Sequence, residues 1–195
     1  NVTCSANEAE FGGAGVLCVN ATVTMDEVNF WTGVCFRAGG MWCNTTDLTM
    51  SNCEFLDNLT TDDGAAMFII ESTLDVTNTS FENNSTQAYG GAIYLWDVTT
   101  TPIFEACTFT SNFGRAGGGA VFTDASRASF TGCMFDDNAS HIGGAFRCSN
   151  AILGSLIELR GCTLQQNEAQ NWSGGAMYLA PGYTVHATDC NFWGN

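Results

Sequence analysis

Short runs of alternating apolar and polar residues recur along the whole chain. A period of two residues is that of a β-strand with one buried face. The paired apolar positions of these runs are Val23/Met25, Leu48/Met50, Leu74/Val76, Pro102/Phe104, Ala128/Phe130, Ile157/Leu159 and Val185/Ala187. Short apolar stretches such as 92–95 and 176–179 lie between the runs, and helical periodicity is absent. The pattern therefore predicts an all-β chain of short strands joined by turns.

A motif, Cys-x-Phe-x-x-Asn, follows the alternating runs. Full copies are Cys53/Phe55/Asn58, Cys107/Phe109/Asn112, Cys133/Phe135/Asn138 and Cys190/Phe192/Asn195, and degenerate copies are Thr79/Phe81/Asn84 and Cys162/Leu164/Asn167. From Phe55 onward the aromatic position advances by 26, 28, 26, 29 and 28 residues. Glycine pairs recur at the same interval, at Gly12–Gly13, Gly39–Gly40, Gly90–Gly91, Gly118–Gly119, Gly143–Gly144 and Gly174–Gly175, with Gly64–Ala65 as the one departure. Each unit of about 26 residues is predicted to hold three short strands.

Stacking of these units predicts a right-handed parallel β-helix of about seven rungs, with residues 1–195 as a single domain. A rung is one full turn of the coil, and equivalent residues of neighbouring rungs line up in columns about 4.8 Å apart. We expect the phenylalanine column to stack inside the coil and the asparagine column to bond along the stack at a turn. The glycine pairs predict a corner that needs positive φ or close backbone approach. The longest spacing predicts that Glu168–Ser173 bulges out as a loop.

Two motifs in fixed order resemble those of a known family. The pair Phe-x-x-Asn and Gly-Gly-Ala-[Ile/Val/Met/Phe], as in 81–84 followed by 90–93, is similar to the repeat of chlamydial polymorphic outer-membrane proteins. That repeat also occurs in large surface proteins of algae and other protists. The resemblance covers nearly the whole chain, and it implies β-helical passengers that are often adhesive and carry no catalytic residues. The many glycosylation sequons depart from the bacterial members.

The charge balance excludes several classes of function. The chain has 20 acidic and 5 basic residues, for a net charge of −15, and all five basic residues are arginine. Nucleic acid and anionic membrane surfaces are poor partners, because both are bound by cationic side chains. Chemistry that needs a lysine is excluded as well. The longest apolar run, Ala65–Ile70, has six residues against the roughly 20 that span a bilayer, so we expect no direct membrane insertion.

Four of the ten cysteines share one predicted column: Cys107, Cys133, Cys162 and Cys190. Neighbouring rungs place Cα atoms about 4.8 Å apart, within the disulfide window of roughly 4.4 to 6.8 Å. Pairing of Cys107 with Cys133 and of Cys162 with Cys190 is one reading, and a ladder of buried free thiols is the other. Cys18 and Cys43 follow successive glycine corners and are a further candidate pair. A metal site is not expected, because no Cys-x-x-Cys occurs and His141 and His186 lie on different rungs.

Sequons for N-glycosylation are unusually frequent, beginning at nine of the 17 asparagines. The candidate acceptors are Asn1, Asn20, Asn44, Asn78, Asn83 and Asn171, and weaker candidates in the repeat's own turn position are Asn58, Asn84 and Asn138. Together with ten cysteines, these sequons favour a eukaryotic secreted or cell-surface glycoprotein with covalent glycans. The alternative is a threonine-rich β-helix that generates sequons by composition alone.

Many parallel β-helices act on polysaccharides, and the acidic pairs are the candidate catalytic groups of this chain. Asp136–Asp137 falls at a turn position of the repeat, and Asp62–Asp63 precedes a corner, where a solvated turn or weak Ca²⁺ binding are the two readings. No column combines arginine with several carboxylates, and neither histidine has a nucleophile motif around it. We therefore expect no catalytic residues, no resident cofactor and no enzyme.

One column was predicted to form a partner-binding stripe: Phe68, Tyr94, Phe122, Arg147 and Tyr178. Adjacent residues of a strand face opposite ways, so the stripe faces outward if the neighbouring Ile93 column faces inward. An exposed aromatic stripe suits packing against another subunit or stacking on sugar rings. The sequence also allows the reversed parity, because Cys43 falls in the stripe's column and the sequon Asn44 in the next.

The expected function is a structural segment of an extracellular appendage or filament. Neither terminus carries a polar capping element, so we expect a piece of a longer solenoid or self-association end to end. The alternative is an adhesin module that binds a host, a partner protein or a glycan surface, and a polysaccharide lyase or hydrolase is the third hypothesis. Contacts with other surface proteins are expected in either of the first two cases.

Overall fold

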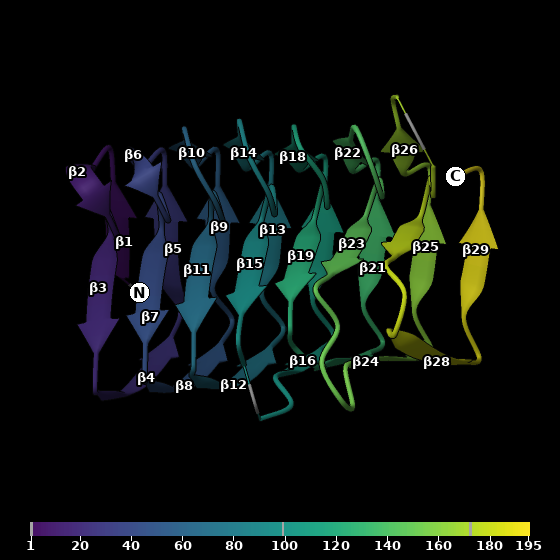
Figure 1. Ribbon diagram of the computed structural model, residues 1–195. Helices are drawn as coiled ribbons and strands as arrows, with labels where there is room; N and C mark the ends of the chain where they lie inside the picture. The colour runs from purple at the N-terminus through teal and green to yellow at the C-terminus, as the bar shows by residue number, and fades with distance from the viewer. Residues whose placement is uncertain (1, 99, 172) are drawn as a thin grey trace.

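The computed structural model describes residues 2–98, 100–171 and 173–195. The described chain is a parallel β-solenoid without a helix, which confirms the predicted fold class. In Figure 1 the chain descends along the front strands, crosses the lower edge, ascends behind and returns over the top, so the coil advances as a right-handed helix from purple to yellow. Strands pair only with equivalents one rung away, in four sheets of eight, seven, seven and seven strands.

Sheets A and B occupy the back and the upper edge of Figure 1. Sheet A contains β1 (Val2–Ser5), β5 (Val28–Trp31), β9 (Glu54–Leu56), β13 (Ser80–Glu82), β17 (Thr108–Thr110), β21 (Met134–Asp136), β25 (Thr163–Gln165) and β29 (Asn191–Trp193). Sheet B contains β2 (Glu8–Gly12), β6 (Val34–Arg37), β10 (Leu59–Thr60), β14 (Ser85–Thr86), β18 (Phe113–Gly114), β22 (Ala139–Ser140) and β26 (Glu168–Ala169).

Sheets C and D occupy the front and the lower edge. Sheet C contains β3 (Val16–Val19), β7 (Met41–Asn44), β11 (Met67–Ile70), β15 (Ile93–Trp96), β19 (Val121–Asp124), β23 (Phe146–Ser149) and β27 (Met177–Leu179). Sheet D contains β4 (Thr22–Asp26), β8 (Asp47–Ser51), β12 (Thr73–Thr77), β16 (Ile103–Glu105), β20 (Ala128–Thr131), β24 (Leu156–Arg160) and β28 (Thr184–Thr188). Three strands per rung were predicted and four are present. The short strands of sheet B were missed, because two residues are too few to show an alternating pattern.

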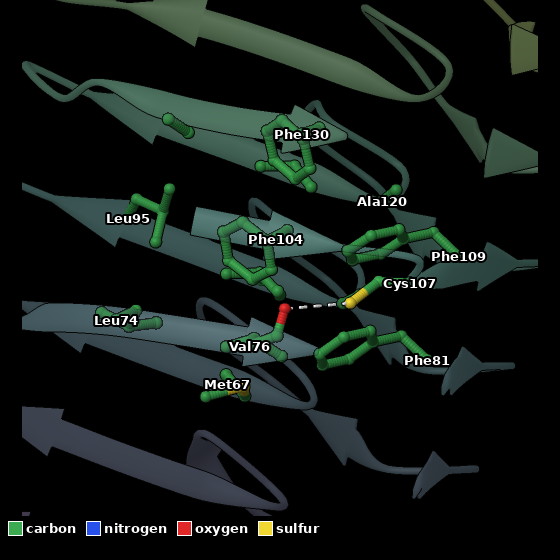
Figure 2. Close-up of a cluster of buried hydrophobic side chains, with 14 of the residues drawn as sticks. Met67, Leu74, Val76, Phe81, Leu95, Phe104, Cys107, Phe109, Ala120 and Phe130 are labelled. Carbon is green, nitrogen blue, oxygen red and sulfur yellow. Dashed lines mark hydrogen bonds between the residues drawn. The ribbon is translucent and has the colours of Figure 1, made fainter. Parts of the chain in front are cut away.

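The predicted aromatic column fills the interior of the coil. Neighbouring rings stack face to face, with centroids 4.6 to 5.0 Å apart, in the series Phe30, Phe55, Phe81, Phe109 and Phe135. Phe104 and Phe130 form a second stacked pair, whose rings contact the rings of the first column edge to face. Figure 2 shows this packing together with the aliphatic side chains that close the core from sheets C and D.

The asparagine column forms a buried hydrogen-bonded ladder. Each side-chain amide donates to the side-chain oxygen of the next rung, at 2.8 to 3.0 Å, in the order Asn58, Asn84, Asn112, Asn138, Asn167 and Asn195. The same amide also donates to the backbone carbonyl of the preceding rung, as Asn112 does to Phe81 at 2.9 Å. The prediction that these asparagines bond along the stack is confirmed.

Four corners turn each rung, and each corner has a column of residues with φ near +60°. The columns are Ala6, Thr32, Asp57, Asn83, Ser111, Asp137, Gln166 and Gly194; Gly13, Ala38, Gly64, Gly90, Gly118, Gly143 and Gly174; Asn20, Thr45, Glu71, Asp97, Ala125 and Asn150; and Glu27, Asn52, Asn78, Ala106, Gly132, Gly161 and Asp189. The glycine column precedes sheet C, as predicted. Two of the predicted pairs are out of register by one residue, because Gly13 and Ala38, rather than Gly12 and Gly39, align with Gly90.

The predicted bulge at 168–173 begins later than expected, and further long connections lie at the corner between sheets C and D. Glu168–Ala169 forms β26, and the Gln170 amide still bonds to the Ser140 carbonyl at 2.7 Å. The expected bulge is therefore limited to residues after Ala169, of which Trp172 lies outside the described residues. Six residues separate β15 from β16, and six separate β23 from β24, where β7 and β8 are separated by two. In the part of the chain that the structure describes, no helix is long and apolar enough to cross a membrane.

Candidate functional site

The predicted partner stripe lies on the outward side of sheet C, but it is covered. Phe68, Tyr94, Phe122, Arg147 and Tyr178 are in register on consecutive strands, and Ile93 belongs to the main core, so the outward parity is correct. The exposed fractions of Phe68, Tyr94 and Phe122 are only 0%, 7% and 3%, so the prediction of an exposed stripe is wrong for these three.

The corner segments between sheets B and C provide the cover. Ala38 packs with the three buried rings and Tyr89 lies against them, whereas Trp42 is the β7 residue of the same column and extends the ring cluster by one rung. The centre of the Tyr89 ring lies 4.5 Å from that of Phe122, with the two rings tilted by 35°, and the Trp42 ring meets Phe68 edge to face at 5.5 Å. The result is a second, lateral core outside the coil. Strand parity alone could not reveal it, because the covering residues come from segments that follow the short strands of sheet B.

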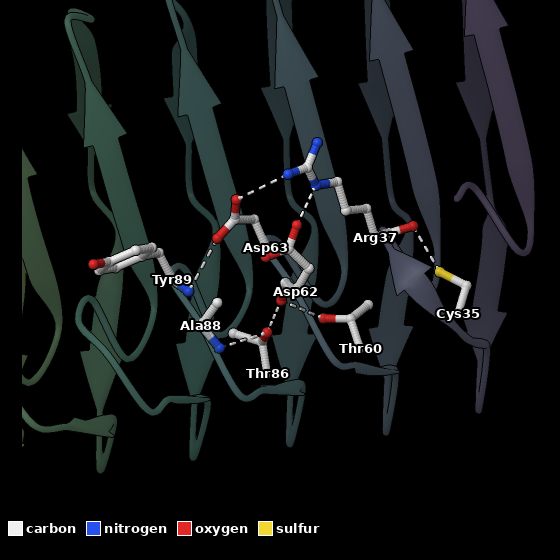
Figure 3. Close-up of polar contacts among 8 residues, drawn as sticks. All are labelled: Cys35, Arg37, Thr60, Asp62, Asp63, Thr86, Ala88 and Tyr89. Carbon is white, nitrogen blue, oxygen red and sulfur yellow. Dashed lines mark hydrogen bonds and ion pairs between the residues drawn. The ribbon is translucent and has the colours of Figure 1, made fainter. Parts of the chain in front are cut away.

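Arg37, Asp62 and Asp63 line one flank of this lateral core (Figure 3). The Arg37 side chain pairs with Asp62 of the next rung through Nε and lies 3.9 Å from Asp63 through its terminal nitrogen. The Tyr89 amide donates to Asp63 at 3.3 Å. Asp63 is only 8% exposed. Burial, reinforced by the Asp62 charge, raises the pKa of Asp63 to about 6.

This arrangement corrects two expectations about the acidic pair. Asp63 is buried and Asp62 is salt-bridged to Arg37, so the pair is not a solvated turn, and weak Ca²⁺ binding there stays a prediction. Arginine and two carboxylates do meet, across adjacent rungs. The sequence contains a signal for this ion pair. Arg37 and Asp62 are 25 residues apart, which is close to the length of one rung, and both lie shortly before a corner. Within residues 2–98, 100–171 and 173–195, no group of three or more His, Cys, Asp or Glu is arranged to hold a metal ion.

Arg147 and Asp124 engage the same lateral core. The Arg147 guanidinium lies 5.0 Å from the centre of the Tyr89 ring and 5.8 Å from that of Phe122, and it donates to the Ala116 carbonyl at 2.7 Å. The Tyr94 hydroxyl donates to Asp124 at 3.2 Å, and burial raises the pKa of this tyrosine. These contacts connect the stripe residues to the residues that cover them. The stripe and its cover therefore belong to one packed core.

The cysteine column is present as predicted, and all ten cysteines are free thiols. The structure therefore has the thiol ladder rather than the pairs Cys107–Cys133, Cys162–Cys190 and Cys18–Cys43, although Cys18 and Cys43 are in register. The thiols bond to the backbone carbonyl two residues earlier, as Cys107 does to Glu105 at 3.3 Å. The Thr79 hydroxyl makes the same bond to Thr77 at 3.0 Å. The column thus selects a small side chain that donates to this carbonyl, which explains why threonine replaces cysteine on one rung.

The sequons divide into buried and exposed sets. Asn58, Asn84 and Asn138 are fully buried members of the ladder, so their amide nitrogens are inaccessible in the folded chain. Asn20, Asn78, Asn83 and Asn171 are exposed, Asn44 is half-buried, and Asn1 lies outside the described residues. Asn20, Asn78 and Asn83 also occupy positive-φ corners, a conformation that asparagine tolerates. The backbone conformation of these corners is therefore sufficient to explain their asparagines. Glycan attachment stays a prediction.

The remaining acidic and histidine candidates do not converge. Asp137 occupies a positive-φ corner, as expected of a turn position, and Asp136 lies on β21. His186 is exposed on β28 beside Glu158, whereas His141 follows β22, which belongs to a different sheet. These positions give no catalytic arrangement of the kind that a polysaccharide-acting β-helix needs.

Sequence reasoning missed a hollow at the corner between sheets C and D. It has a volume of about 300 Å³ and is lined by Val98, Ala125, Arg127, Ile152, Leu153 and Ser155. The extra residues between β23 and β24 build one wall of it. The only available signal was the longer spacing between Cys133 and Cys162, which indicates an insertion but not its place on the rung.

The chain shows similarity to known repeat proteins. Residues 78–95 match the model of the Chlamydia polymorphic membrane protein repeat, and this segment contains one copy of both motifs quoted above. The chain is 28% identical over 209 residues to a probable outer membrane protein pmp6 of Chlamydia pneumoniae, across 97% of this chain and 15% of that protein. It is 30% identical over 150 residues to metabotropic glutamate receptor-like protein R of Dictyostelium discoideum, across 76% of this chain and 9% of that protein.

The chain thus spans less than a sixth of the length of either relative. No solved structure matches it. The family repeat joins two features that the structure places in separate columns, the buried asparagine ladder and the glycine corner before sheet C. On this basis the chain carries a repeat of the chlamydial polymorphic membrane protein type, built into a continuous parallel β-solenoid.

Proposed function

We propose that this chain is a rigid, non-enzymatic structural module of a cell-surface protein. The observation that carries the proposal is the unbroken asparagine ladder from Asn58 to Asn195, because it ties consecutive rungs together inside the coil. A stiff rod of this kind holds the groups attached along it at fixed positions, and this role needs no active site. The surface location is supported by the similarity to a relative described as an outer membrane protein.

The module joins other coils or surface proteins through its ends and sides. Rungs pair through backbone N–H and C=O groups that point along the solenoid axis, so one coil can continue into another by the same pairing. Such a contact is heterologous and does not close on itself, so it produces a filament. The exposed sequons carry covalent glycans in this proposal, and an intact mass before and after enzymatic deglycosylation tests their occupancy.

Electron microscopy of the purified chain tests the filament. Ordered fibrils one solenoid wide support end-to-end association. Monodisperse particles that stay single at high protein concentration contradict it.

A second candidate function is an adhesin module, which the exposed apolar loop between β23 and β24 favours. Leu153 at its tip is fully exposed and Ile152 is 49% exposed. Single particles that bind cells or immobilised glycans would support this function over the filament. Release of soluble sugar from a uronic-acid polymer, abolished by a chelator, would contradict the non-enzymatic proposal.

A further inference from the structure

The inserted residues between sheets C and D gather on one edge of the solenoid. Figure 1 shows a loop that extends beyond the lower edge after β23, and six residues separate β23 from β24 where two separate β7 from β8. The loop after β23 exposes Ile152 and Leu153 to solvent. Exposed aliphatic side chains at a loop tip are a common feature of interaction sites.

The hollow beside this loop has a fixed base. The Tyr183 hydroxyl accepts from the Ser126 amide at 3.1 Å and donates to the Thr123 carbonyl at 3.4 Å, so it ties the corner to a rung almost 60 residues earlier. The Ser155 hydroxyl accepts from the Ile152 amide at 2.9 Å and closes the loop on itself. The hollow is therefore formed before any partner arrives, which lowers the entropic cost of binding.

Arg127 gives the hollow its charge. No carboxylate among the described residues lies within 4.0 Å of it, whereas Arg37 and Arg160 each have an acidic neighbour. The Arg127 guanidinium lies directly against Gly154, where a Cβ would overlap its terminal nitrogen. In a chain of net charge −15, a cation placed beside aliphatic side chains and without an acidic partner is available to an external carboxylate.

We propose that this corner binds an acidic peptide segment of a partner protein. A carboxylate of the segment pairs with Arg127, and a neighbouring aliphatic side chain packs on Ile152 and Leu153. An acidic sugar fits less well, because the lining is aliphatic rather than aromatic and its one hydroxyl, on Ser155, is only 2% exposed and already bonded. A second copy of the chain would bring another charge of −15 against this one.

Methyl NMR of the 195-residue chain tests the proposal with defined probes. The first probe is the peptide acetyl-Gly-Leu-Asp-Leu-Gly-amide, the second has asparagine for aspartate, and the third is hexagalacturonate. The aspartate peptide is expected to shift the methyl signals of Val98, Ile152 and Leu153, and to bind at least fivefold more tightly than its asparagine counterpart. Arg127→Gln is expected to weaken binding roughly tenfold.

Two further variants keep the test specific. Gly154→Ala retains the arginine but fills the space that its guanidinium occupies, so it is expected to weaken binding as well. Arg160→Gln removes an exposed arginine beside Glu158 on β24 and is expected to leave binding unchanged. Equal affinity for the two peptides, no shift at the three residues, or shifts with hexagalacturonate alone would overturn the proposal. The Arg127 site takes no part in the end-to-end pairing of coils. A failure of the peptide-binding proposal can therefore be told apart from a failure of the filament proposal.

Discussion

Single residues in this solenoid are constrained most strongly where a polar group is buried. The ladder asparagines satisfy backbone groups that neither water nor the sheets can reach, and Asn112 alone makes four hydrogen bonds through its side chain. A buried donor left without a partner costs about 1 to 3 kcal/mol. The fold therefore requires asparagine at these buried positions.

Replacement of Asn112 tests this directly. Asn112→Ala leaves the Asn84 amide donors and the Phe81 carbonyl unpaired, so the free energy of unfolding is expected to fall by about 3 to 5 kcal/mol. Asn191→Ala is the matched control, because Asn191 is exposed on β29, and a change below about 0.5 kcal/mol is expected. Urea denaturation measures both, and similar losses in the two variants would contradict the role given to the ladder.

Asp63 makes stability depend on pH. Its pKa of about 6 lies above the value of roughly 4 for an unfolded aspartate, so the folded state holds the proton more tightly. The stability from this group is present below about pH 4 and is lost as pH rises through about 6.

Asp63→Asn removes this pH dependence. The variant is expected to gain stability relative to the parent at pH 7.5, on the order of 1 kcal/mol, and to match it at pH 4. Thermal unfolding at the two pH values measures the difference. An effect of equal size at both values would show that the carboxylate charge is not the cause.

Whole elements depend on how closely neighbouring rungs approach at the corner before sheet C. An added Cβ on Gly119 would overlap the Gly144 carbonyl oxygen and would lie 2.7 Å from the Ala139 amide nitrogen. Both contacts are with backbone, which cannot move without breaking the sheet pairing. Gly132, unlike Gly119, has positive φ, and nothing lies within 4 Å of the position its Cβ would take.

Alanine at these two glycines separates close approach from backbone conformation. Gly132→Ala is expected to cost about 1 kcal/mol, from the left-handed conformation alone. Gly119→Ala has no left-handed backbone cost but introduces overlap with backbone atoms of the next rung, so it is expected to cost about 3 kcal/mol or more, or to prevent folding. Circular dichroism during heating reports both, and equal melting temperatures for the two variants would show that close approach is unimportant.

The sequence predicts the residues that recur at fixed offsets, and it misses very short strands and contacts made across a corner. Phe81, Asn84 and Gly90 recur at the same offsets on several rungs, so their columns could be read without coordinates. The strand Ser85–Thr86 could not be predicted, because two residues are too few to show alternation. The cover supplied by Tyr89 could not be predicted either, because it depends on how a corner folds back over sheet C. The salt bridge of Arg37 was missed because its partner lies on the next rung and its own corner has alanine at the glycine position.

The whole molecule is an acidic rod, and its charge opposes association. Two coils of net charge −15 repel at low ionic strength, and salt screens that repulsion over about 10 Å at 0.1 M. If filaments form by axial backbone pairing, fibril mass is expected to rise several-fold between 10 mM and 300 mM NaCl. Sedimentation across this range measures it, and fibrils that dissolve as salt is added would show that charge attraction, not backbone pairing, holds them.

The solenoid depends most on the alignment of equivalent residues from rung to rung. Nuclear Overhauser effects on the 195-residue chain test this alignment directly. Cross-peaks are expected between the ring protons of Phe81 and Phe109, and between the side-chain amide protons of Asn84 and Asn112, both pairs being 28 residues apart. Absence of both sets in a folded sample, or cross-peaks that link these residues to other partners, would contradict the stacked solenoid.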